Sequence, residues 1–380
     1  MMSNQPIEAV YIHIPFCLRK CNYCDFLSFY RPEEMTSYVD ALAKEMEIAA
    51  AAYEVKAKTI FIGGGTPSCL EESLLEIVLQ AVQKYFGSEA LVEYTMEANP
   101  GTLSAEKLAL MRKYGVNRLS LGVQSDRTDH LKMLGRIHSF DEARQAVELA
   151  RAAGFENINL DFMYGLPGQT AEQWSETLVN AIRLNPQHLS LYQLKIEEGT
   201  AMYQWLEDGK ISEFDDEQAL AMYRIAQHVL AEHGYGQYEI SNYAQPGRES
   251  LHNQVYWRTE NYLGVGLGAC SWVRPLRWNN QFEMNDYIGL VQTGQLPGQE
   301  PEHLTETEQM EETVFMALRM NQGLSKQLFS ERFAKPAEAV FADALRRCME
   351  KGWIKETEEA YFLTEEGRVL GNLVFMEFIQ

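Results

Sequence analysis

Long apolar runs and basic residues are both scarce in this 380-residue chain. No stretch approaches the roughly 20 consecutive apolar residues that span a bilayer, and residues 1–7 lack the basic and apolar regions of a secretory signal. The 33 Lys and Arg residues stand against 54 Asp and Glu, which gives a formal net charge of −21. Binding to phosphate backbones needs clustered positive charge, so no nucleic acid partner is expected. We expect a cytoplasmic protein without stable membrane insertion.

Cysteine is too scarce for a disulfide scaffold, and the six cysteines are unevenly placed. Cys17, Cys21 and Cys24 fall within eight residues. In a chain without a secretory signal, such a group indicates metal binding or redox chemistry. The other three cysteines are isolated and are expected to be small buried hydrophobes: Cys69, Cys270 and Cys348.

The three grouped cysteines leave two kinds of metal site open. A structural zinc site normally needs a fourth Cys or His, and the nearest candidate, His13, precedes the cysteines in a predicted strand. Three thiolates with one open corner suit a [4Fe–4S] cluster whose fourth iron takes an exogenous ligand. The spacing therefore favours an iron–sulfur cluster over zinc.

Apolar residues make up 46% of the chain, which is enough for a packed core. In the first half, short apolar runs alternate with helical patterns, as is typical of parallel strands covered by helices. Six such units form either an open doubly wound sheet or a partial barrel. The predicted strands are Ala9–Ile14, Thr59–Ile62, Val92–Glu97, Arg118–Val123, Ile158–Met163 and His188–Leu194, and the predicted helices cover residues 33–53, 70–86, 104–113, 139–153 and 170–183.

Polar and glycine-rich segments follow the ends of these strands. The cysteines come after the first strand, Gly63–Pro67 after the second, and Glu97–Pro100 at the end of the third. Gln124 and Asp161 lie at the ends of the fourth and fifth strands. Because ligands bind at the carboxyl ends of parallel strands, we expect these residues to share one site.

The alternation of strand and helix patterns ends at about residue 200. A helix over 215–233 and a strand over Gly236–Tyr243 are predicted, and residues 250–280 are interpreted as irregular functional loops. From residue 303, three helices and a hairpin resemble a winged helix, but without a basic face a packing or lid role is favoured over DNA binding. The expected domains are 1–200, 201–302 and 303–380.

The run from Tyr11 to Cys24 carries the CxxxCxxC signature of radical S-adenosylmethionine (SAM) enzymes. With the Gly-Gly-Gly-Thr-Pro segment after the second strand, this resemblance implies an α/β fold, a partial (β/α)6 barrel with the winged-helix-like unit appended. It also implies that Cys17, Cys21 and Cys24 hold a [4Fe–4S] cluster with SAM on the open iron. The SAM contacts implied by the resemblance are Tyr11, Tyr23, Gly64, Gly65, Thr66, Glu97, Gln124, Arg136 and Asp161.

Most of the chain resembles the oxygen-independent coproporphyrinogen III oxidase family. True oxidases carry a further cysteine two places after the third, where this chain has Phe26. They also carry an N-terminal extension, whereas the first strand here begins by about residue 9. The segment from His252 to Trp257, His-Asn-Gln-Val-Tyr-Trp, instead resembles the HNxxYW signature of the HemW-type branch of heme chaperones. That resemblance implies His252 as a heme ligand; from the residues alone, a packed, hydrogen-bonded histidine is the alternative.

The resemblance implies a protein that binds heme and delivers it to apo-hemoproteins, and it allows for a homodimer. The alternative is radical decarboxylation of coproporphyrinogen III to protoporphyrinogen IX. The propionates of a porphyrinogen would require cations, for which Arg19, Lys20, Arg274 and Arg277 are candidates. A winged-helix regulator that senses iron or heme is disfavoured, because the chain is acidic and a DNA-binding protein needs clustered positive charge.

Overall fold

The computed structural model describes residues 6–379. Its centre is a curved sheet whose first six strands run parallel and pair in sequence order. Consecutive strands therefore stay neighbours, and this order forms a partial (β/α)6 barrel rather than a doubly wound sheet. The strands are β1 (Ile7–Ile14), β2 (Val55–Gly64), β3 (Glu93–Ala98), β4 (Arg118–Gln124), β5 (Asn157–Tyr164) and β6 (His188–Gln193).

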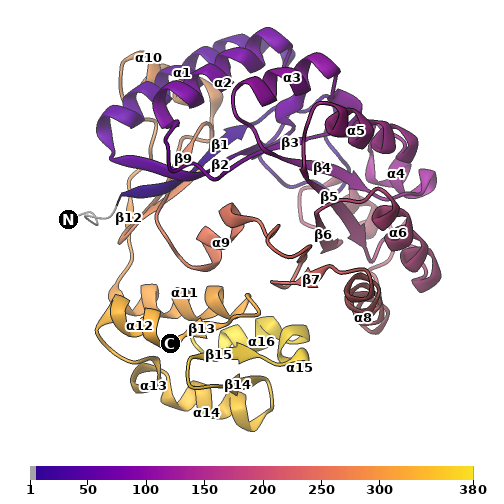
Figure 1. Cartoon of the computed structure of the whole chain (residues 1–380), viewed down its shortest axis with the longest axis vertical. Coiled ribbons are helices and arrows are strands. Elements are labelled where there is room, and N and C mark those ends of the chain that lie inside the picture. The colour runs from indigo at the N-terminus through magenta and orange to yellow at the C-terminus, as the bar shows by residue number, and fades with distance from the viewer. Residues whose placement is uncertain (1–5, 380) are drawn as a thin grey trace.

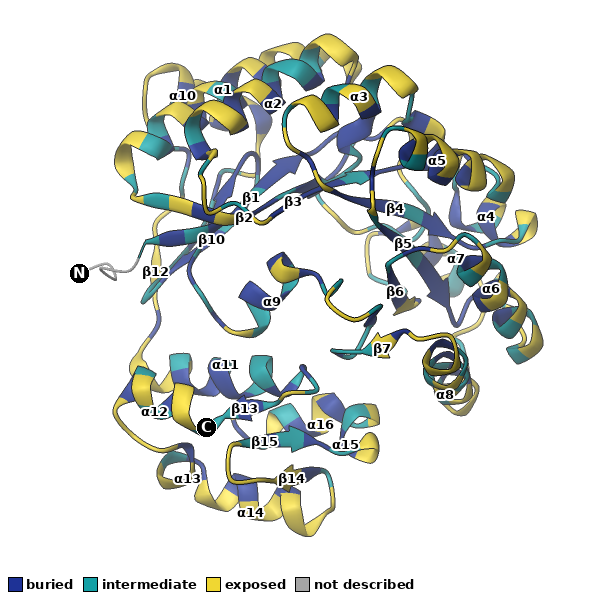
Figure 2. Cartoon of the chain, in the orientation of Figure 1, coloured by how far each residue is buried: buried dark blue, intermediate teal, exposed yellow. Residues whose placement is uncertain are grey.

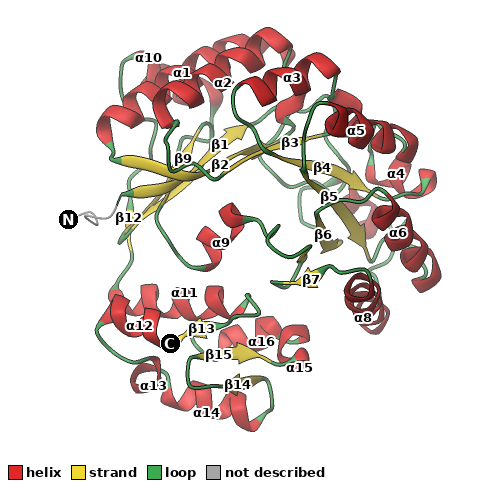
Figure 3. Cartoon of the chain, in the orientation of Figure 1, coloured by secondary structure: helices red, strands yellow, loops and turns green. Residues whose placement is uncertain are grey.

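Helices cover the convex face of this sheet (Figures 1 and 3). All five predicted helices are present, and Ser139 and Thr170 form the capping boxes that begin α5 and α6. Two short helices, α4 and α7, were not predicted, since seven residues carry too little periodicity. The helices of this half are α1 (Met35–Ala52), α2 (Glu72–Phe86), α3 (Ala105–Lys113), α4 (Thr128–Leu134), α5 (Phe140–Ala152), α6 (Ala171–Arg183), α7 (Ala201–Glu207) and α8 (Asp216–Glu232).

Residues 201–302 extend the same sheet at both edges. The single strand predicted over Gly236–Tyr243 is wrong, because a turn divides it into two short antiparallel strands beside β6. At the other edge, one strand pairs parallel to β1 and three more continue antiparallel. These elements are β7 (Gly236–Gln237), β8 (Asn242–Ala244), β9 (Tyr262–Val265), β10 (Cys270–Val273), β11 (Leu276–Asn279), β12 (Glu302–His303), α9 (Leu251–Trp257) and α10 (Met284–Gln292).

The prediction of irregular loops over 250–280 is therefore wrong. Each element there has only four to seven residues, which is too short for a helical or strand periodicity to show in the sequence. The connections on either side of β9 also contain Asn261, Gly266 and Gly268. Helix α9 lies on the concave side of the sheet (Figure 1). Buried Glu93 of β3 accepts hydrogen bonds from the backbone N–H groups of Leu251 and His252, both at 2.9 Å. This carboxylate satisfies donors at the start of α9 and fixes the helix to the barrel.

The C-terminal unit has its own apolar core, built around Phe329, Phe341 and Phe378. Its three-stranded sheet and preceding helices match the predicted winged-helix-like arrangement, and two further helices follow. Figure 2 shows the buried faces of these helices turned inward. The elements are α11 (Glu306–Leu318), β13 (Leu324–Ser325), α12 (Lys326–Phe333), α13 (Ala337–Val340), α14 (Ala342–Glu350), β14 (Ile354–Glu356), β15 (Ala360–Leu363), α15 (Glu365–Val369) and α16 (Gly371–Met376). No helix within residues 6–379 is long and apolar enough to cross a membrane.

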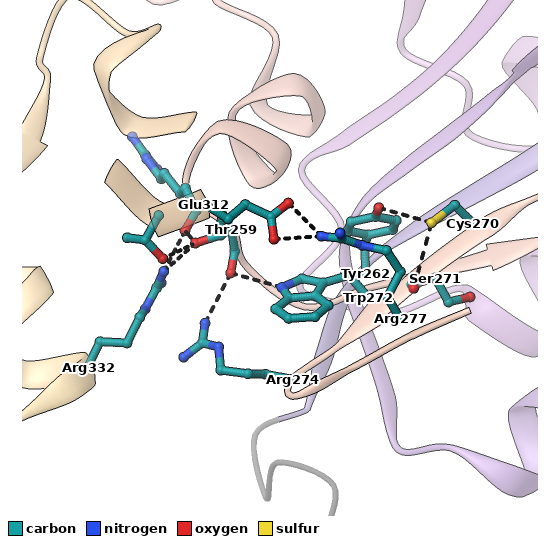
Figure 4. Close-up of polar contacts among 11 residues, drawn as sticks. Thr259, Tyr262, Cys270, Ser271, Trp272, Arg274, Arg277, Glu312 and Arg332 are labelled. Atoms are coloured by element: carbon teal, nitrogen blue, oxygen red, sulfur yellow. Dashed lines mark hydrogen bonds and ion pairs between the residues drawn. The ribbon is translucent and has the colours of Figure 1, made fainter. Parts of the chain in front are cut away.

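Polar contacts join this unit to the β9–β11 edge (Figure 4). Arg277 donates to both carboxylate oxygens of Glu312 and its guanidinium lies over the ring of Trp272. Arg274 donates to the carbonyl of Thr259 at 3.0 Å, and Arg332 of α12 donates to the hydroxyl of the same threonine. Arg274 and Arg277 are thus engaged within the protein, which removes two of the four cations considered for propionates.

We expect Arg277→Ala to lower the free energy of unfolding by about 3 kcal/mol, because it leaves a largely buried Glu312 without its partner. The exposed Lys44–Glu47 pair is the comparison, and Lys44→Ala should destabilise the protein far less than Arg277→Ala does. Urea unfolding of both variants measures the difference. Equal effects would show that the Arg277–Glu312 pair contributes no more than a surface contact.

Candidate functional site

The cysteine loop is held against the end of β2 by backbone hydrogen bonds. The N–H groups of Gly65 and Thr66 donate to the carbonyls of Ile14 and Phe16, at 2.8 and 2.7 Å. Cys17 N–H donates to the carbonyl of Phe29 at 3.0 Å, which brings the two limbs of the loop together. The segment after β2 therefore acts as a support for the loop that carries the thiols.

The three thiols are neighbours at the carboxyl edge of the sheet. Burial raises the pKa of Cys17 and Cys24, and the nearby Cys21 adds to both shifts. Thr66 Oγ1 lies 3.5 Å from Cys17 Sγ, and the guanidinium of Arg136 donates to Cys21 Sγ at 3.4 Å. Such contacts stabilise thiolates once a metal displaces their protons, so the three cysteines fit a cluster.

A zinc site is not supported. His13 has both ring nitrogens engaged: Nδ1 lies 2.9 Å from the hydroxyl of Tyr11, and Nε2 lies 2.9 Å from the carbonyl of Leu27. Since a carbonyl only accepts, Nε2 carries the proton and Tyr11 donates to Nδ1. His13 therefore positions the cysteine loop, a role that sequence reasoning did not assign.

The glycines after β2 are required by the protein's own packing. A Cβ on Gly65 would lie 2.5 Å from the carbonyl oxygen of Phe16, and Gly64 has a φ of +108°. Gly64 and Gly65 are also among the SAM contacts that the resemblance implies. They first allow the cysteine loop to approach, and Thr66 then reaches Cys17.

Two neighbouring carboxylates lie near the carboxyl ends of β3 and β5. Burial and, to a lesser extent, the nearby Asp161 raise the pKa of Glu97 to about 8. Glu97 accepts a hydrogen bond from the N–H of Gly64 at 3.1 Å, whereas Asp161 accepts from Asn159 and Ser120 at 2.8 and 3.3 Å. Two partly desolvated carboxylates favour a cationic ligand with hydroxyl groups, and SAM has both features.

We expect Glu97→Gln to weaken SAM binding at least tenfold while stabilising the cofactor-free protein above pH 5. The folded-state pKa of about 8 exceeds the ordinary value of 4.5, so Glu97 costs stability as pH rises from 4.5 towards 8. The slope from one group is at most about 1.4 kcal/mol per pH unit. Thermal unfolding of both proteins between pH 5 and 8 tests this; parallel curves would contradict the assignment.

Gln124, Arg136 and Tyr23 complete the predicted SAM contacts. Gln124 has a φ of 71° at a bulge in β4, a strained conformation that turns its side chain at the strand end. Arg136 contacts Cys21 and also donates to the carbonyl of Gly122. Burial raises the pKa of Tyr23, and the adjacent Arg136 opposes that shift. The structure thus gathers all nine predicted residues around the cysteine loop and the neighbouring strand ends.

Tyr192 lies near these carboxylates, and sequence reasoning missed it. It follows Ser190 by two positions on β6, so both side chains share the face that carries Asp161. Burial and the neighbouring Asp161 raise the pKa of its phenol, although 42% of the residue stays exposed. The alternation of His188, Ser190 and Tyr192 was a signal that could have found it.

His252 lies on α9 and is fully buried, so the alternative of a packed histidine describes this conformation. Its Nδ1 lies 2.9 Å from Thr59 Oγ1, and its Nε2 lies 2.8 Å from the hydroxyl of Tyr256. Its ring stacks on Phe61, and burial lowers its pKa to about 3. Neither nitrogen is free to bind iron in this arrangement, and the residue instead secures α9 against β2.

Of the isolated cysteines, Cys69 and Cys348 are buried, as predicted, but Cys270 is only half-buried. Its sulfur accepts a hydrogen bond from Tyr262 at 3.6 Å (Figure 4).

Comparison with known proteins agrees with this site. Residues 11–180 match the radical SAM superfamily, and residues 304–370 match the HemN C-terminal domain. The chain is 39% identical to the heme chaperone HemW of Bacillus subtilis over 98% of this chain and 99% of that protein. It is 43% identical to the heme chaperone HemW of Escherichia coli over 70% of this chain and 71% of that one.

A solved structure described as coproporphyrinogen III oxidase (HemN) from Escherichia coli covers 98% of this chain and 90% of its own, with a TM-score of 0.85 and 24% identity. At that identity the likeness establishes the fold and not the activity. The superfamily implies SAM and a [4Fe–4S] cluster as cofactors. With relatives of this identity along nearly its whole length, the chain belongs to the HemW family of radical SAM proteins.

Proposed function

We propose that this protein is a heme chaperone, which binds heme and delivers it to apo-hemoproteins. The observation that carries this proposal is 39% identity to a heme chaperone over almost the entire length of both chains. Phe26 supports it from within the sequence, because it stands where the oxidases carry a further cysteine. The residue is 65% exposed.

Cys17, Cys21 and Cys24 hold the cluster in this proposal, and Arg136 donates to the Cys21 sulfur. Glu97 and Asp161 hold the cationic end of SAM, while Thr66 and Gln124 lie at neighbouring strand ends. When bound, a reduced cluster supplies the electron on which radical SAM chemistry depends. Helix α9 lies on the concave side of the sheet (Figure 1).

The second candidate is oxygen-independent coproporphyrinogen III oxidase activity, which the shared fold with that enzyme keeps open. Anaerobically reconstituted protein is given SAM, a strong reductant and coproporphyrinogen III, with a verified oxidase run alongside. We expect no protoporphyrinogen from this chain. Conversion would overturn the chaperone proposal and show that Phe26 does not prevent the oxidase reaction.

A further inference from the structure

An exposed apolar surface surrounds the cysteine loop. Leu18, Phe26, Tyr30 and Phe282 are 45%, 65%, 61% and 47% exposed. We call these four residues the cysteine-loop patch. Large apolar side chains that gather at a surface commonly mark a binding site. This patch lies directly outside the cysteines.

Contacts bring the members of the patch together from two segments. Cys17 N–H bonds to the carbonyl of Phe29, so Leu18 and Tyr30 continue from adjacent limbs of the loop. At Gly268, a Cβ would lie 2.5 Å from Leu27 and 3.1 Å from Phe282, which places Phe282 beside the returning limb. The cysteine loop and the segment between β11 and α10 thus form one surface.

Two free cations border this surface. Arg19 and Lys20 are both exposed. The Lys20 ammonium donates to the carbonyl of Phe26 at 3.2 Å, so it lies beside the patch. Within residues 6–379, neither side chain forms an ion pair with a carboxylate, in a chain whose net charge is −21. Arg274 and Arg277, the other candidate cations, are occupied by Thr259 and Glu312.

We propose that the cysteine-loop patch binds one face of heme, with Arg19 and Lys20 paired to its propionates. This inference rests on the proposed chaperone function and locates its cargo. A porphyrin is a flat apolar ring with two carboxylates on one edge, and the patch offers aromatic surface beside two unpaired cations. The fully hydrogen-bonded His252 is not the iron ligand in this arrangement. Phe26, in place of the oxidases' cysteine, contributes the most exposed ring.

The test is hemin titration of the anaerobically reconstituted holo-protein, followed by absorbance. Phe26→Glu and Phe282→Glu should each raise the Kd at least tenfold, and Phe282 lies outside the cysteine loop should the first variant disturb the cluster. Met376→Glu on α16 is the matched control, since Met376 is 68% exposed and belongs to the C-terminal unit. Iron and sulfide content is measured for every variant.

A double charge reversal, Arg19→Glu with Lys20→Glu, tests the propionate contacts. It should weaken hemin binding at least tenfold but leave the affinity for iron protoporphyrin dimethyl ester within twofold. Unchanged hemin affinity in the patch variants, with wild-type binding intact, would overturn this site and leave the chaperone function standing. If the charge reversal instead slows only cluster reduction by an acidic electron-transfer protein, the patch docks that donor and the heme assignment is wrong. Failure of the wild-type protein to bind hemin would refute the proposed function itself.

Discussion

Alanine at Cys17, Cys21 and Cys24 together is expected to remove the iron–sulfur absorbance of the reconstituted protein and reduce bound iron from about four atoms per chain to nearly none. Each thiol lies at the mouth of the partial barrel. Burial raises the pKa of Cys17 and Cys24, so their ionised forms need a metal partner. Loss of all three removes every cluster ligand that the loop offers.

Cys348→Ala provides the control for that experiment. Cys348 is buried in the core of the C-terminal unit, so its replacement should reduce stability but leave the iron and sulfide content unchanged. Iron and sulfide that persist in the triple variant would show that the cluster is bound elsewhere.

Gly65→Ala is expected to displace the cysteine loop, although it adds only one methyl group. The new Cβ would lie 2.5 Å from the carbonyl oxygen of Phe16, a backbone atom that cannot rotate away. Overpacking of this kind costs about 1–3 kcal/mol in unfolding free energy. We further expect at least half of the cluster content to be lost, because the Gly65 and Thr66 backbone bonds hold the loop.

Gly289→Ala on α10 is the matched control for that substitution. No atom lies within 4 Å of the Cβ that this change adds. Alanine favours helix over glycine by up to about 1 kcal/mol, so this variant should be as stable as the wild type or slightly more so. If Gly65→Ala also keeps its stability and its full cluster content, the close approach of the two segments is not a constraint.

The alternation of parallel strands and helices could be predicted from the sequence because the six strands are short apolar runs and most are followed by an amphipathic helix. That pattern left an open doubly wound sheet and a partial barrel both possible, and only the resemblance to radical SAM proteins favoured the barrel. The predicted and observed strands differ by a few residues at their ends, as β2 shows by beginning at Val55 rather than Thr59. Parallel strands bring their carboxyl ends to one edge. From that rule, the sequence predicts that Glu97, Gln124 and Asp161 lie near the cysteines.

The structure of the second half is harder to predict from the sequence, because its helices and strands are short and pack against elements that are distant in the chain. Strand β9 pairs with β1 across some 250 positions, and α9 is fixed by Glu93 of β3. The sequence of residues 250–280 alone therefore does not predict these contacts with β1 and β3. The same limit applies to His252, whose burial depends on Thr59 and Phe61 of β2.

Transfer of heme to an apo-acceptor is the activity that defines a heme chaperone, and its measurement decides whether this protein has that function. The reconstituted protein is loaded with one equivalent of hemin, separated from free hemin, and mixed with an apo-hemoprotein whose holo-spectrum is distinct. We expect growth of the acceptor spectrum and matching loss of heme from this chain, faster than the uptake of the same amount of free hemin by the acceptor. Heme that stays bound to the wild-type protein, or reaches the acceptor no faster than free hemin does, would contradict a chaperone function.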